Sequence, residues 1–530
     1  MKKSKLSLLG LGMLLSVTGC GAEDIIHNVD QNLAHELPSK QVTIKFWHCL
    51  GHEKGENLWD VIEAFNREYA GKYKVVERNP GGGYSGLHKA IKNAIRAGSG
   101  IPTMAIGYPD SFAEYMGTKE NRSNILRLNN FYTDSIYGYD PDGNKDELVN
   151  VDFVENYFNE GQGYQFKGLW SLPMYKSTEV MFYNLDYFSG KNELNEKKFG
   201  NTTWWQEYAE DNFKDEDGDD LVYYSTKGHD LYAAALATLK AKVIEEGGYA
   251  YTVPETWDQM VATSKQIIAD RKTMEVYSSG NYGVGYDSDA NLIITQLAQR
   301  GYKYTTNDNV KNKKDHIQFN NQNTIGLVSE LNQLYKDHVL LTKGTLDSTG
   351  TKYTNDEFTG GEDGTPNIWM CVGSTGGSNY QETSKFAVGV AHVPYSNNNP
   401  LYIQQGPSIC FFDHESEEVN LGAWLFYQKL ANAQTNAELA TENSYDPVRV
   451  SSFDTDTYKD YKADRKVSML SEVPWVTEEI KDKLITSPVF VGSSTAREEI
   501  GKLLAYVRFS GLSAKAAVEK AYKATVNKTK

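Results

Sequence analysis

The sequence predicts an α/β fold that is divided into at least two lobes. Two observations carry this prediction. Between residues 41 and 110, segments with the alternation of strands are separated by segments with the apolar spacing of helices. Strands and helices that alternate in this way form a parallel sheet covered by helices. In addition, 530 residues exceed what one hydrophobic core organises, so the chain is expected to divide.

Five elements follow one another in the first part of the chain. Residues 41–48 (QVTIKFWH) alternate apolar and polar side chains, as a strand does, and residues 56–69 (ENLWDVIEAFNREY) repeat apolar residues at helical spacing. Residues 73–78 (YKVVER) form a second expected strand. Residues 86–100 (GLHKAIKNAIRAGSG) predict a helix that stops at glycine, and residues 103–110 (TMAIGYPD) predict a third strand. Ligands of such sheets bind beyond the carboxyl ends of the strands.

Helical patterns recur further along the chain. Residues 254–270 open with proline, which suits the first turn of a helix. No internal repeat is present, and after the first twenty residues no segment approaches the roughly 18 apolar residues of a membrane-spanning helix. The other expected helices lie at 323–338, 417–432, 495–507 and 511–524.

The N-terminus predicts secretion and lipid attachment. Lysine occupies three of the first five residues, and the apolar run 6–17 is too short to span a bilayer. Residues 17–20 (VTGC) resemble a lipobox, in which the cysteine receives a diacylglycerol and becomes the mature N-terminus. An ordinary signal peptide with an incidental cysteine is the alternative. We therefore expect a signal peptide at 1–19, lipidation at Cys20, a flexible tether at 20–40, and a location on the extracytoplasmic face of the cell membrane.

Net charge and cysteine content exclude some classes of protein. The formal net charge of −16 argues against a nucleic-acid partner, whose phosphates need basic residues. Beyond Cys20, the cysteines are Cys49, Cys371 and Cys410. An odd number allows at most one disulfide, which excludes a disulfide-based scaffold. Free buried thiols are expected, although a pair among the three stays open.

The motifs of common enzyme and metal sites are incomplete in this sequence or do not occur in it. Residues 215–220 (DEDGDD) suggest a calcium loop, but with Gly218 at position 6, Phe213 and Tyr224 stand where oxygen ligands are needed. Residues 373–378 (GSTGGS) lack the lysine and spacing of a phosphate-binding loop, and no GxSxG nucleophile motif occurs. The sequence predicts no enzyme, no cofactor and no metal site. A solvated acidic loop is preferred at 215–220, with an irregular cation site as the alternative.

Five motifs carry a resemblance to a known family. VTIKFWH with LWDVIEAFNREYAGKYKVV resembles the family's opening strand, helix and second strand, and AIRAGSGIPTMAIGYPDSFAEY resembles the stretch that follows. LPMYKSTEVMFYNLDYF is similar to a segment that crosses between lobes and ends in Tyr183-Asn184. VPETWDQM matches a helix start, and SYDPVRVSS is similar to a late segment. From about residue 41 to its end, the chain resembles the extracellular solute-binding proteins of sugar-type ABC importers, which include maltodextrin-binding proteins.

The chain departs from the family pattern at two places. About 70 residues separate Asn184 from Pro254, where the family has a short loop, and the late glycine-tyrosine pair reads Ser444-Tyr445. The resemblance implies a two-lobed, periplasmic-binding-protein-like (type II) fold with a hinge and a ligand cleft between the lobes. The implied ranges are 41–176 plus 406–450 for lobe one, 177–405 plus 451–530 for lobe two, about 186–252 for an insertion, and 175–179, 404–407 and 448–452 for the crossings.

The resemblance also implies a function. The chain would be the substrate-binding lipoprotein of an ABC importer that captures a sugar or oligosaccharide and delivers it to a permease. Its partners would be the carbohydrate ligand, the ABC transporter permease subunits and, through the lipid anchor, the membrane, with the protein itself a monomer. Three alternatives stay open: a carrier for a phosphorylated small molecule such as glycerol phosphate, a surface glycosidase with two carboxylates flanking one bond, and an adhesin.

A sugar site combines aromatic rings for the apolar face with a few polar groups for the hydroxyls. We therefore expect ligand contacts after strand ends, in the crossings and in the loops of lobe two. Structural roles are the alternatives: the core for Trp47, a helix cap for Asp110 and an ion pair at the hinge for Arg449. The candidates are Trp47, His48, Tyr84, Tyr108, Asp110, Ser177, Tyr286, Asp287, Asn291, Ser374, Gly376 and Arg449.

Overall fold

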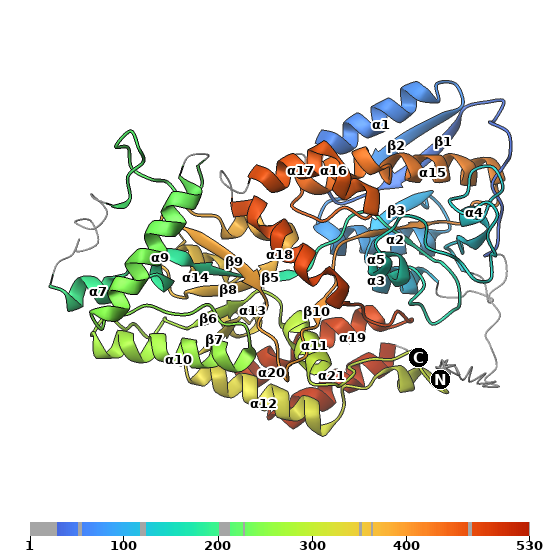
Figure 1. Cartoon of the computed structure of the whole chain (residues 1–530). Helices are drawn as coiled ribbons and strands as arrows, with labels where there is room; N and C mark the ends of the chain where they lie inside the picture. The colour runs from blue at the N-terminus through green and yellow to red at the C-terminus, as the bar shows by residue number, and fades with distance from the viewer. Residues whose placement is uncertain are drawn as a thin grey trace, which may run out of the picture.

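Two five-stranded sheets, each with its own helices, form two lobes that lie side by side (Figure 1). The expected two-lobed α/β fold is confirmed. A pair of short strands between the two sheets forms a separate small sheet. The structure is a computed structural model that describes residues 29–50, 56–116, 123–200, 212–225, 228–348, 352–361, 364–464 and 469–528.

The first sheet is built around a strand that the sequence predicts. β1 (Val42–Trp47) runs parallel to β2 (Tyr73–Arg78) and to β3 (Met104–Gly107). A later segment, β11 (Ser408–Phe411), adds to β3 in antiparallel orientation, and β4 (Leu172–Pro173) pairs with β11 at the edge. The apolar residues of β1 point into the core, because alternate side chains of a strand face the same side.

Helices from both ends of the chain cover this sheet. α15 (Glu417–Leu430) packs on β1 and on α1 (Glu56–Glu68), and α16 (Ala433–Glu442) also contacts α1. α2 (Gly83–Ala97) ends as expected at Gly98, which has a φ of 63° and donates its N–H to the carbonyl of Ile95. Shorter helices are α3 (Pro109–Tyr115), α4 (Asn129–Tyr132) and α5 (Glu155–Glu160).

Part of the expected tether is packed against the first lobe. Val29 and Leu33 are buried, Asp30 pairs with Arg127 at 2.6 Å from its Nε, and the N–H of Ala34 donates to the carbonyl of Glu417. These contacts give residues 29–34 a fixed place. The expected lipidation site Cys20 and the expected signal peptide lie outside the described residues.

In the second sheet, the crossing strand is an interior strand next to the edge strand β9. β5 (Glu179–Asn184) lies between β8 (Met370–Ser374) and β9 (Val388–His392) and is antiparallel to both. β6 (Val284–Tyr286) runs parallel to β8 and to β7 (Leu340–Thr342). One edge of the sheet, formed by strand ends, therefore carries the carboxyl ends of β6 and β8 and the amino end of β5.

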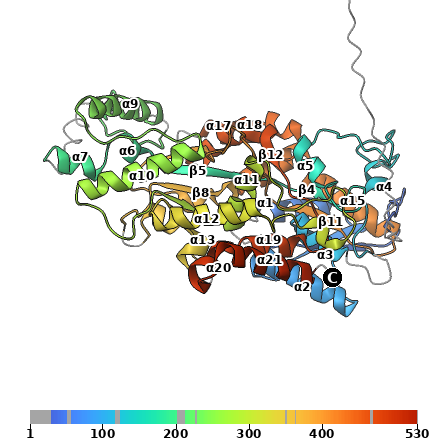
Figure 2. The ribbon, with the colours of Figure 1, turned by 90° about the horizontal axis from the view of Figure 1, so that it is seen from below.

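Long helices flank the second sheet. α10 (Trp257–Thr273) begins as predicted after the proline, and its cap Thr256 forms a capping box with Gln259. Within the expected insertion, α9 packs a small core of its own with Phe213 and lies with α7 at the end of the molecule farthest from α4 and α15 (Figure 2). The bounds are α6 (Leu185–Phe188), α7 (Glu193–Lys198), α9 (His229–Glu245), α11 (Asp289–Gln299), α12 (Gln322–Lys336), α13 (Lys343–Leu346), α14 (Asn355–Thr359), α17 (Asp456–Ala463) and α18 (Val473–Ile480).

The end of the chain differs from the expectation of two helices at 495–507 and 511–524. Three helices occur: α19 (Ser493–Ile500), α20 (Leu503–Ser510) and α21 (Ala514–Lys528). The break falls at Gly501, where an added Cβ would lie 3.2 Å from the Cβ of Ala290. At this glycine the chain passes close to α11, and the stretch that is periodic in sequence divides into α19 and α20. α19 also packs against α3 of the first lobe.

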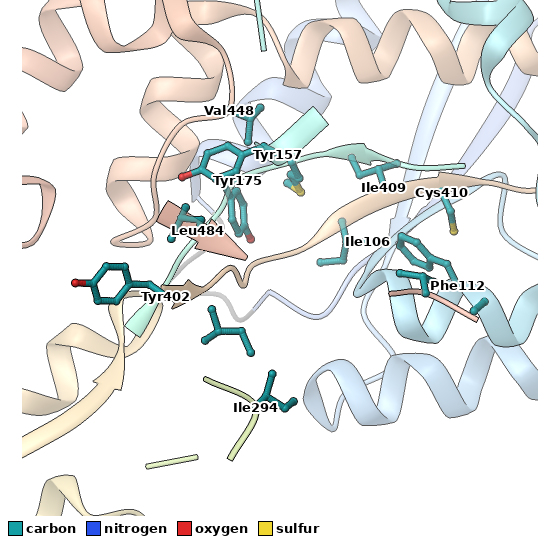
Figure 3. Close-up of a cluster of buried hydrophobic side chains, with 14 of the residues drawn as sticks. Ile106, Phe112, Tyr157, Tyr175, Ile294, Tyr402, Ile409, Cys410, Val448 and Leu484 are labelled. Atoms are coloured by element: carbon teal, nitrogen blue, oxygen red, sulfur yellow. The ribbon is translucent and has the colours of Figure 1, made fainter. Parts of the chain in front are cut away.

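A continuous hydrophobic cluster joins the two lobes. The short strands β10 (Tyr402–Ile403) and β12 (Leu484–Ile485) pair in parallel between the sheets. Figure 3 shows side chains from both strands, and Tyr175 from a crossing, in one cluster with Ile106 and Ile409 of the first sheet. The lobes are therefore linked by packed side chains as well as by the chain itself.

Two general features concern cysteines and the membrane. Cys49, Cys371 and Cys410 are free, and burial raises the pKa of each thiol, that of Cys49 to about 12. Within the described ranges, every helix is too short or too polar to cross a membrane.

Candidate functional site

Three chain segments meet between the sheets. Ser177 exchanges two backbone hydrogen bonds with Gln405, at 3.1 and 2.7 Å, and Lys176 exchanges two with Asp446, at 2.9 and 2.6 Å. The Lys176 ammonium is buried, contacts Glu160 and donates to the Ser408 hydroxyl at 2.9 Å. Burial lowers the pKa of Lys176, and the Glu160 carboxylate opposes this shift. The three segments, which contain Lys176-Ser177, Gln405 and Asp446, are thus hydrogen-bonded to one another where strand ends of both sheets meet.

We call this connection between the two lobes the junction. Four tyrosines gather there, and we call them the junction tyrosines: Tyr84, Tyr108, Tyr175 and Tyr445. The rings of Tyr84 and Tyr108 are 4.7 Å apart between centroids, and those of Tyr175 and Tyr445 are 4.5 Å apart. Burial raises the pKa of each hydroxyl, that of Tyr445 to about 12. The hydroxyls therefore stay protonated at neutral pH, so each one is able both to donate and to accept a hydrogen bond.

The second lobe reaches this cluster through a glycine. A Cβ added to Gly376 would lie 2.4 Å from the ring of Tyr445, so the backbone of the glycine-rich turn approaches the ring more closely than any side chain would allow. The turn is the 3-10 helix Thr375–Gln381, which follows β8 directly.

The charge of a guanidinium from the second lobe acts on a carboxyl of the first lobe nearby. Asp110 lies in the first turn of α3 and accepts the N–H of Ser111 at 2.8 Å. Burial raises the pKa of Asp110, and the positive charge of Arg497, on α19, opposes this. The same charge acts on Tyr108. Opposite charges thus line the junction from the two sides.

A buried carboxyl organises the second-lobe edge. Glu179 accepts hydrogen bonds from the Tyr286 hydroxyl and from the side-chain amide of Asn291, each at 2.6 Å. Burial raises the pKa of Glu179 to about 7, although both hydrogen bonds and the charge of Arg497 oppose this. Arg497 in turn donates to the carbonyl oxygen of Asn291. Ser374 is the strand partner of Glu179.

Polar atoms without a partner occur in the crossing segments. Both the oxygen and the nitrogen of the Gln404 side-chain amide are buried without a hydrogen-bond partner among the described residues, as are the Tyr175 hydroxyl and the side-chain oxygen of Gln405. Proteins rarely leave buried polar groups unpaired. In the crossing segments these atoms have hydrogen-bonding capacity that the described residues leave unused.

The structure brings several predicted site residues together. Tyr84, Tyr108 and Asp110 lie on the first-lobe side. Ser177 lies in the crossing, buried and bound through its backbone. On the second-lobe side, Tyr286, Asn291 and Ser374 surround Glu179, and Gly376 contacts Tyr445.

Four predicted residues have other partners. Trp47 is buried under the guanidinium of Arg78, which lies 4.4 Å from the ring centroid. The buried His48 contacts Glu77 at 2.9 Å. Asp287 accepts two hydrogen bonds from Thr354, both at 2.7 Å. Arg449 pairs with Asp152 at 3.0 Å between its Nε and the carboxylate. This contact corresponds to the structural alternative for Arg449, which is an ion pair.

Five residues of the junction escaped the sequence analysis: Tyr175, Glu179, Gln404, Tyr445 and Arg497. Four of them stand in or beside segments that were recognised as crossings or as family motifs, so a search for aromatic and polar residues within those segments would have found them. Arg497 has no such signal, because only the packing of α19 on α3 and α11 brings it to the junction.

Comparisons with known proteins agree with this architecture. Residues 60–466 match the family of bacterial extracellular solute-binding proteins, while no curated protein matches the sequence. The GacH receptor of Streptomyces glaucescens GLA.O is 15% identical with a TM-score of 0.58, over 92% of this chain and 98% of that one. UgpB from Mycobacterium tuberculosis, solved with glycerophosphocholine, is 14% identical with a TM-score of 0.59, over 92% and 98%.

A further similar structure is the cyclic alpha-maltosyl-1,6-maltose binding protein from Arthrobacter globiformis. It is 14% identical to this chain, with a TM-score of 0.59, and the alignment covers 92% of this chain and 99% of that one. At such identities the likeness shows the fold alone.

Proposed function

This chain belongs to the bacterial extracellular solute-binding proteins, and from that membership we propose that it is the substrate-binding subunit of an ABC importer. In this proposal it captures a sugar or oligosaccharide at the junction and delivers it to a membrane permease. The observation that carries the proposal is the coincidence of four junction tyrosines with buried, unpartnered polar groups on Tyr175 and Gln404.

The chemistry of this combination suits a sugar. A pyranose has an apolar face, which the ring of a tyrosine covers, and a rim of hydroxyls that both donate and accept. The Gln404 amide offers one acceptor and one donor group without a protein partner, and a single hydroxyl or a neighbouring pair satisfies both. A ligand that touches both lobes favours their closed arrangement by its differential affinity.

The balance of charge favours a neutral ligand over a phosphorylated one. The positive charge of Arg497 already interacts with two acidic groups, the Asp110 carboxyl and the Glu179 carboxyl. A phosphodiester would bring one further negative charge, and a phosphomonoester up to two, to a buried place that already holds two carboxyls, which is costly without additional cations. Glycerophosphodiesters and sugar phosphates therefore serve as competing ligands in the test.

A thermal-shift screen of mono-, di- and oligosaccharides, sugar phosphates and glycerophosphodiesters tests the proposal. A ligand that binds only the folded protein raises its apparent stability by RT ln(1 + [L]/Kd). We expect a neutral sugar to raise the melting temperature and to be recovered unchanged. A phosphorylated ligand as the best binder would support the alternative, and cleavage of the sugar would indicate a glycosidase. No shift with any compound would contradict the proposal.

We also propose that Cys20 carries the lipid that holds the protein at the extracytoplasmic face of the membrane. The support is the lipobox-like sequence before it. Cys20→Ser should move the processed protein from the membrane fraction to the soluble fraction, as judged by fractionation and immunoblot. Membrane retention of the processed variant would contradict lipid anchoring.

A further inference from the structure

The second-lobe edge of the junction contains a chain of four side chains from four elements. Tyr286 ends β6, Glu179 begins β5, Asn291 lies in the first turn of α11 and Arg497 lies on α19. The first three are almost completely buried, with exposed fractions of 1%, 2% and 1%. Hydrogen bonds run from Tyr286 and Asn291 to Glu179 and from Arg497 to Asn291.

Chemistry allows only one orientation of the Asn291 amide within this chain. A guanidinium can only donate, so the group that faces Arg497 must be the Asn291 carbonyl oxygen. The Asn291 NH2 group then faces Glu179 and needs an acceptor there. Glu179 supplies one with its Oε1, at 2.6 Å. If that acceptor were lost, the Asn291 amide would no longer be held with its oxygen toward the guanidinium.

We propose that Glu179 and Asn291 are positioning residues that form a hydrogen-bond relay, which holds the Arg497 guanidinium toward the junction. This inference rests on the proposed function for its consequence, because the guanidinium is then a specificity-determining group for the ligand. Arg497 meets the ligand in this scheme, whereas Glu179 and Asn291 act through it.

The position of Arg497 on a helix that packs against the first lobe explains why its orientation matters. α19 packs against α3, and the charge of Arg497 acts on Asp110 and Tyr108 of the first lobe as well as on Glu179. A guanidinium that is fixed in this place presents donors beside the carboxyl acceptor of Asp110. A hydroxyl between the two would accept from one group and donate to the other, whereas a free arginine would populate many rotamers.

An ordinary buried polar cluster is the competing explanation, and a residue on the same helix provides a matched control. Asp289 is buried two residues before Asn291 and accepts from the Thr342 hydroxyl and the N–H of Gly344, both at 2.7 Å. Asp289→Asn and Asn291→Leu each disturb buried hydrogen bonds of α11. Only Asn291→Leu touches the relay.

Calorimetric titration with the sugar found by screening gives the first test. We expect Arg497→Met and Asn291→Leu each to weaken binding about tenfold. The double variant should bind no more weakly than Arg497→Met alone, because Asn291 acts through Arg497. Asp289→Asn should lower the melting temperature and leave Kd unchanged. Wild-type binding by folded Asn291→Leu, or losses that multiply in the double variant, would overturn the relay.

Variants of Glu179 distinguish hydrogen bonding from charge. Glu179→Gln keeps an oxygen acceptor for Asn291 and can turn its NH2 toward the Tyr286 oxygen, so its Kd should stay within about twofold of wild type. Glu179→Leu removes the acceptor and should bind as weakly as Asn291→Leu. An equal loss in both Glu179 variants would overturn the hydrogen-bond relay.

A measurement without ligand separates failure of the relay from failure of the proposed function. Carbon-13 NMR of protein labelled at aspartate reports the pKa of Asp110, which the Arg497 charge lowers against the effect of burial. In Asn291→Leu and Arg497→Met this pKa should rise, and in Asp289→Asn it should not change. An unchanged pKa in Asn291→Leu would overturn the relay, whether or not any sugar binds the wild-type protein.

Discussion

At the junction, the first-lobe side carries aromatic rings, whereas the second-lobe side carries a chain of buried hydrogen bonds. The rings of Tyr84, Tyr108, Tyr175 and Tyr445 contact one another in pairs at 4.5–4.7 Å. Across from them, Glu179 binds two partners at 2.6 Å each. Both surfaces lie where the strands of an α/β sheet end. The same architecture therefore carries an aromatic surface in one lobe and a polar surface in the other.

The difference lies in how strongly each surface depends on direction. Contact between rings and an apolar sugar face depends mainly on buried area, so a ligand can slide over the rings at little cost. Hydrogen bonds weaken steeply when their angle changes, and a buried polar group left unpaired is costly. We infer that the tyrosine side supplies most of the affinity and that the polar side selects the orientation of the ligand.

The largest expected effect comes from removing a ring on the aromatic side. Tyr445→Ala deletes the ring that contacts Tyr175 and Gly376, and we expect the sugar to bind at least about thirtyfold more weakly, or about 2 kcal/mol. Tyr445→Phe keeps the ring and should lose far less. The measurement is calorimetric titration, with circular dichroism to verify folding.

A pair of glycine variants tests the same ring without changing it. A Cβ at Gly376 would lie 2.4 Å from the Tyr445 ring, whereas among the described residues a Cβ at Gly377 would meet only Tyr380, at 3.6 Å. Gly376→Ala should therefore displace the ring and weaken binding, while Gly377→Ala should not. Equal affinities for the two variants would show that the position of the ring is unimportant and would break the comparison.

The next effect concerns the carboxyl on the aromatic side. Asp110→Ala would leave ligand hydroxyls unpaired, and we expect a loss of about 1–3 kcal/mol, roughly ten- to a hundredfold in Kd. Asp110→Asn keeps an acceptor and should lose less. Stability should change little, because the carboxyl accepts only the neighbouring N–H of Ser111 from the backbone. If Asp110→Ala binds the sugar like wild type, the carboxyl does not contact the ligand.

The sequence predicts the fold well wherever local periodicity decides it. The five elements between residues 41 and 110 occur as expected, because their apolar spacing matches one face of a strand or helix. The break at Gly501 was not predictable in this way, since it depends on the distance to Ala290 in another helix. Local pattern determines elements, whereas their interruption often depends on a distant neighbour.

The same distinction applies to the site. Tyr108 and Asp110 lie at the junction because they follow a strand, and strand ends meet there. Trp47 ends a strand and His48 follows it, but their side chains contact Arg78 and Glu77 of the adjacent β2. That pairing follows from strand register, which the sequence alone did not reveal. Arg497, far along the chain, reaches the junction only through packing.

On the polar side, an effect is expected in the pH dependence of stability rather than in binding. Burial raises the pKa of Glu179 to about 7, so between its unfolded value near 4.5 and pH 7 the folded state binds more protons than the unfolded state. Its contribution to stability therefore falls as pH rises through this range, by at most about 3 kcal/mol. Glu179→Gln removes the titration.

Urea unfolding of wild type and Glu179→Gln at pH 5 and pH 8 measures this effect. The stability of the variant relative to wild type should be higher at pH 8 than at pH 5. Asp446, whose pKa burial raises to about 7, shifts both proteins alike and cancels in the comparison. If the difference between the two proteins is the same at both pH values, Glu179 does not titrate in this range.

The smallest effect on binding is expected at Arg449, which sharpens the comparison by testing where the junction ends. Its guanidinium pairs with Asp152 and lies over the rings of Tyr139 and Phe153, at 4.8 and 4.5 Å from their centroids. Arg449→Met should lower stability by about 1 kcal/mol, through loss of a partly exposed ion pair and of cation–π contact. The sugar should bind with an unchanged Kd, because all of these partners lie on the first-lobe side and none is a junction tyrosine. Titration and urea unfolding of the same preparation separate the two quantities. A loss of affinity greater than about threefold in the folded variant would show that Arg449 contacts the ligand. The aromatic side of the junction would then include a cation, contrary to the contacts that Arg449 makes with Asp152, Tyr139 and Phe153.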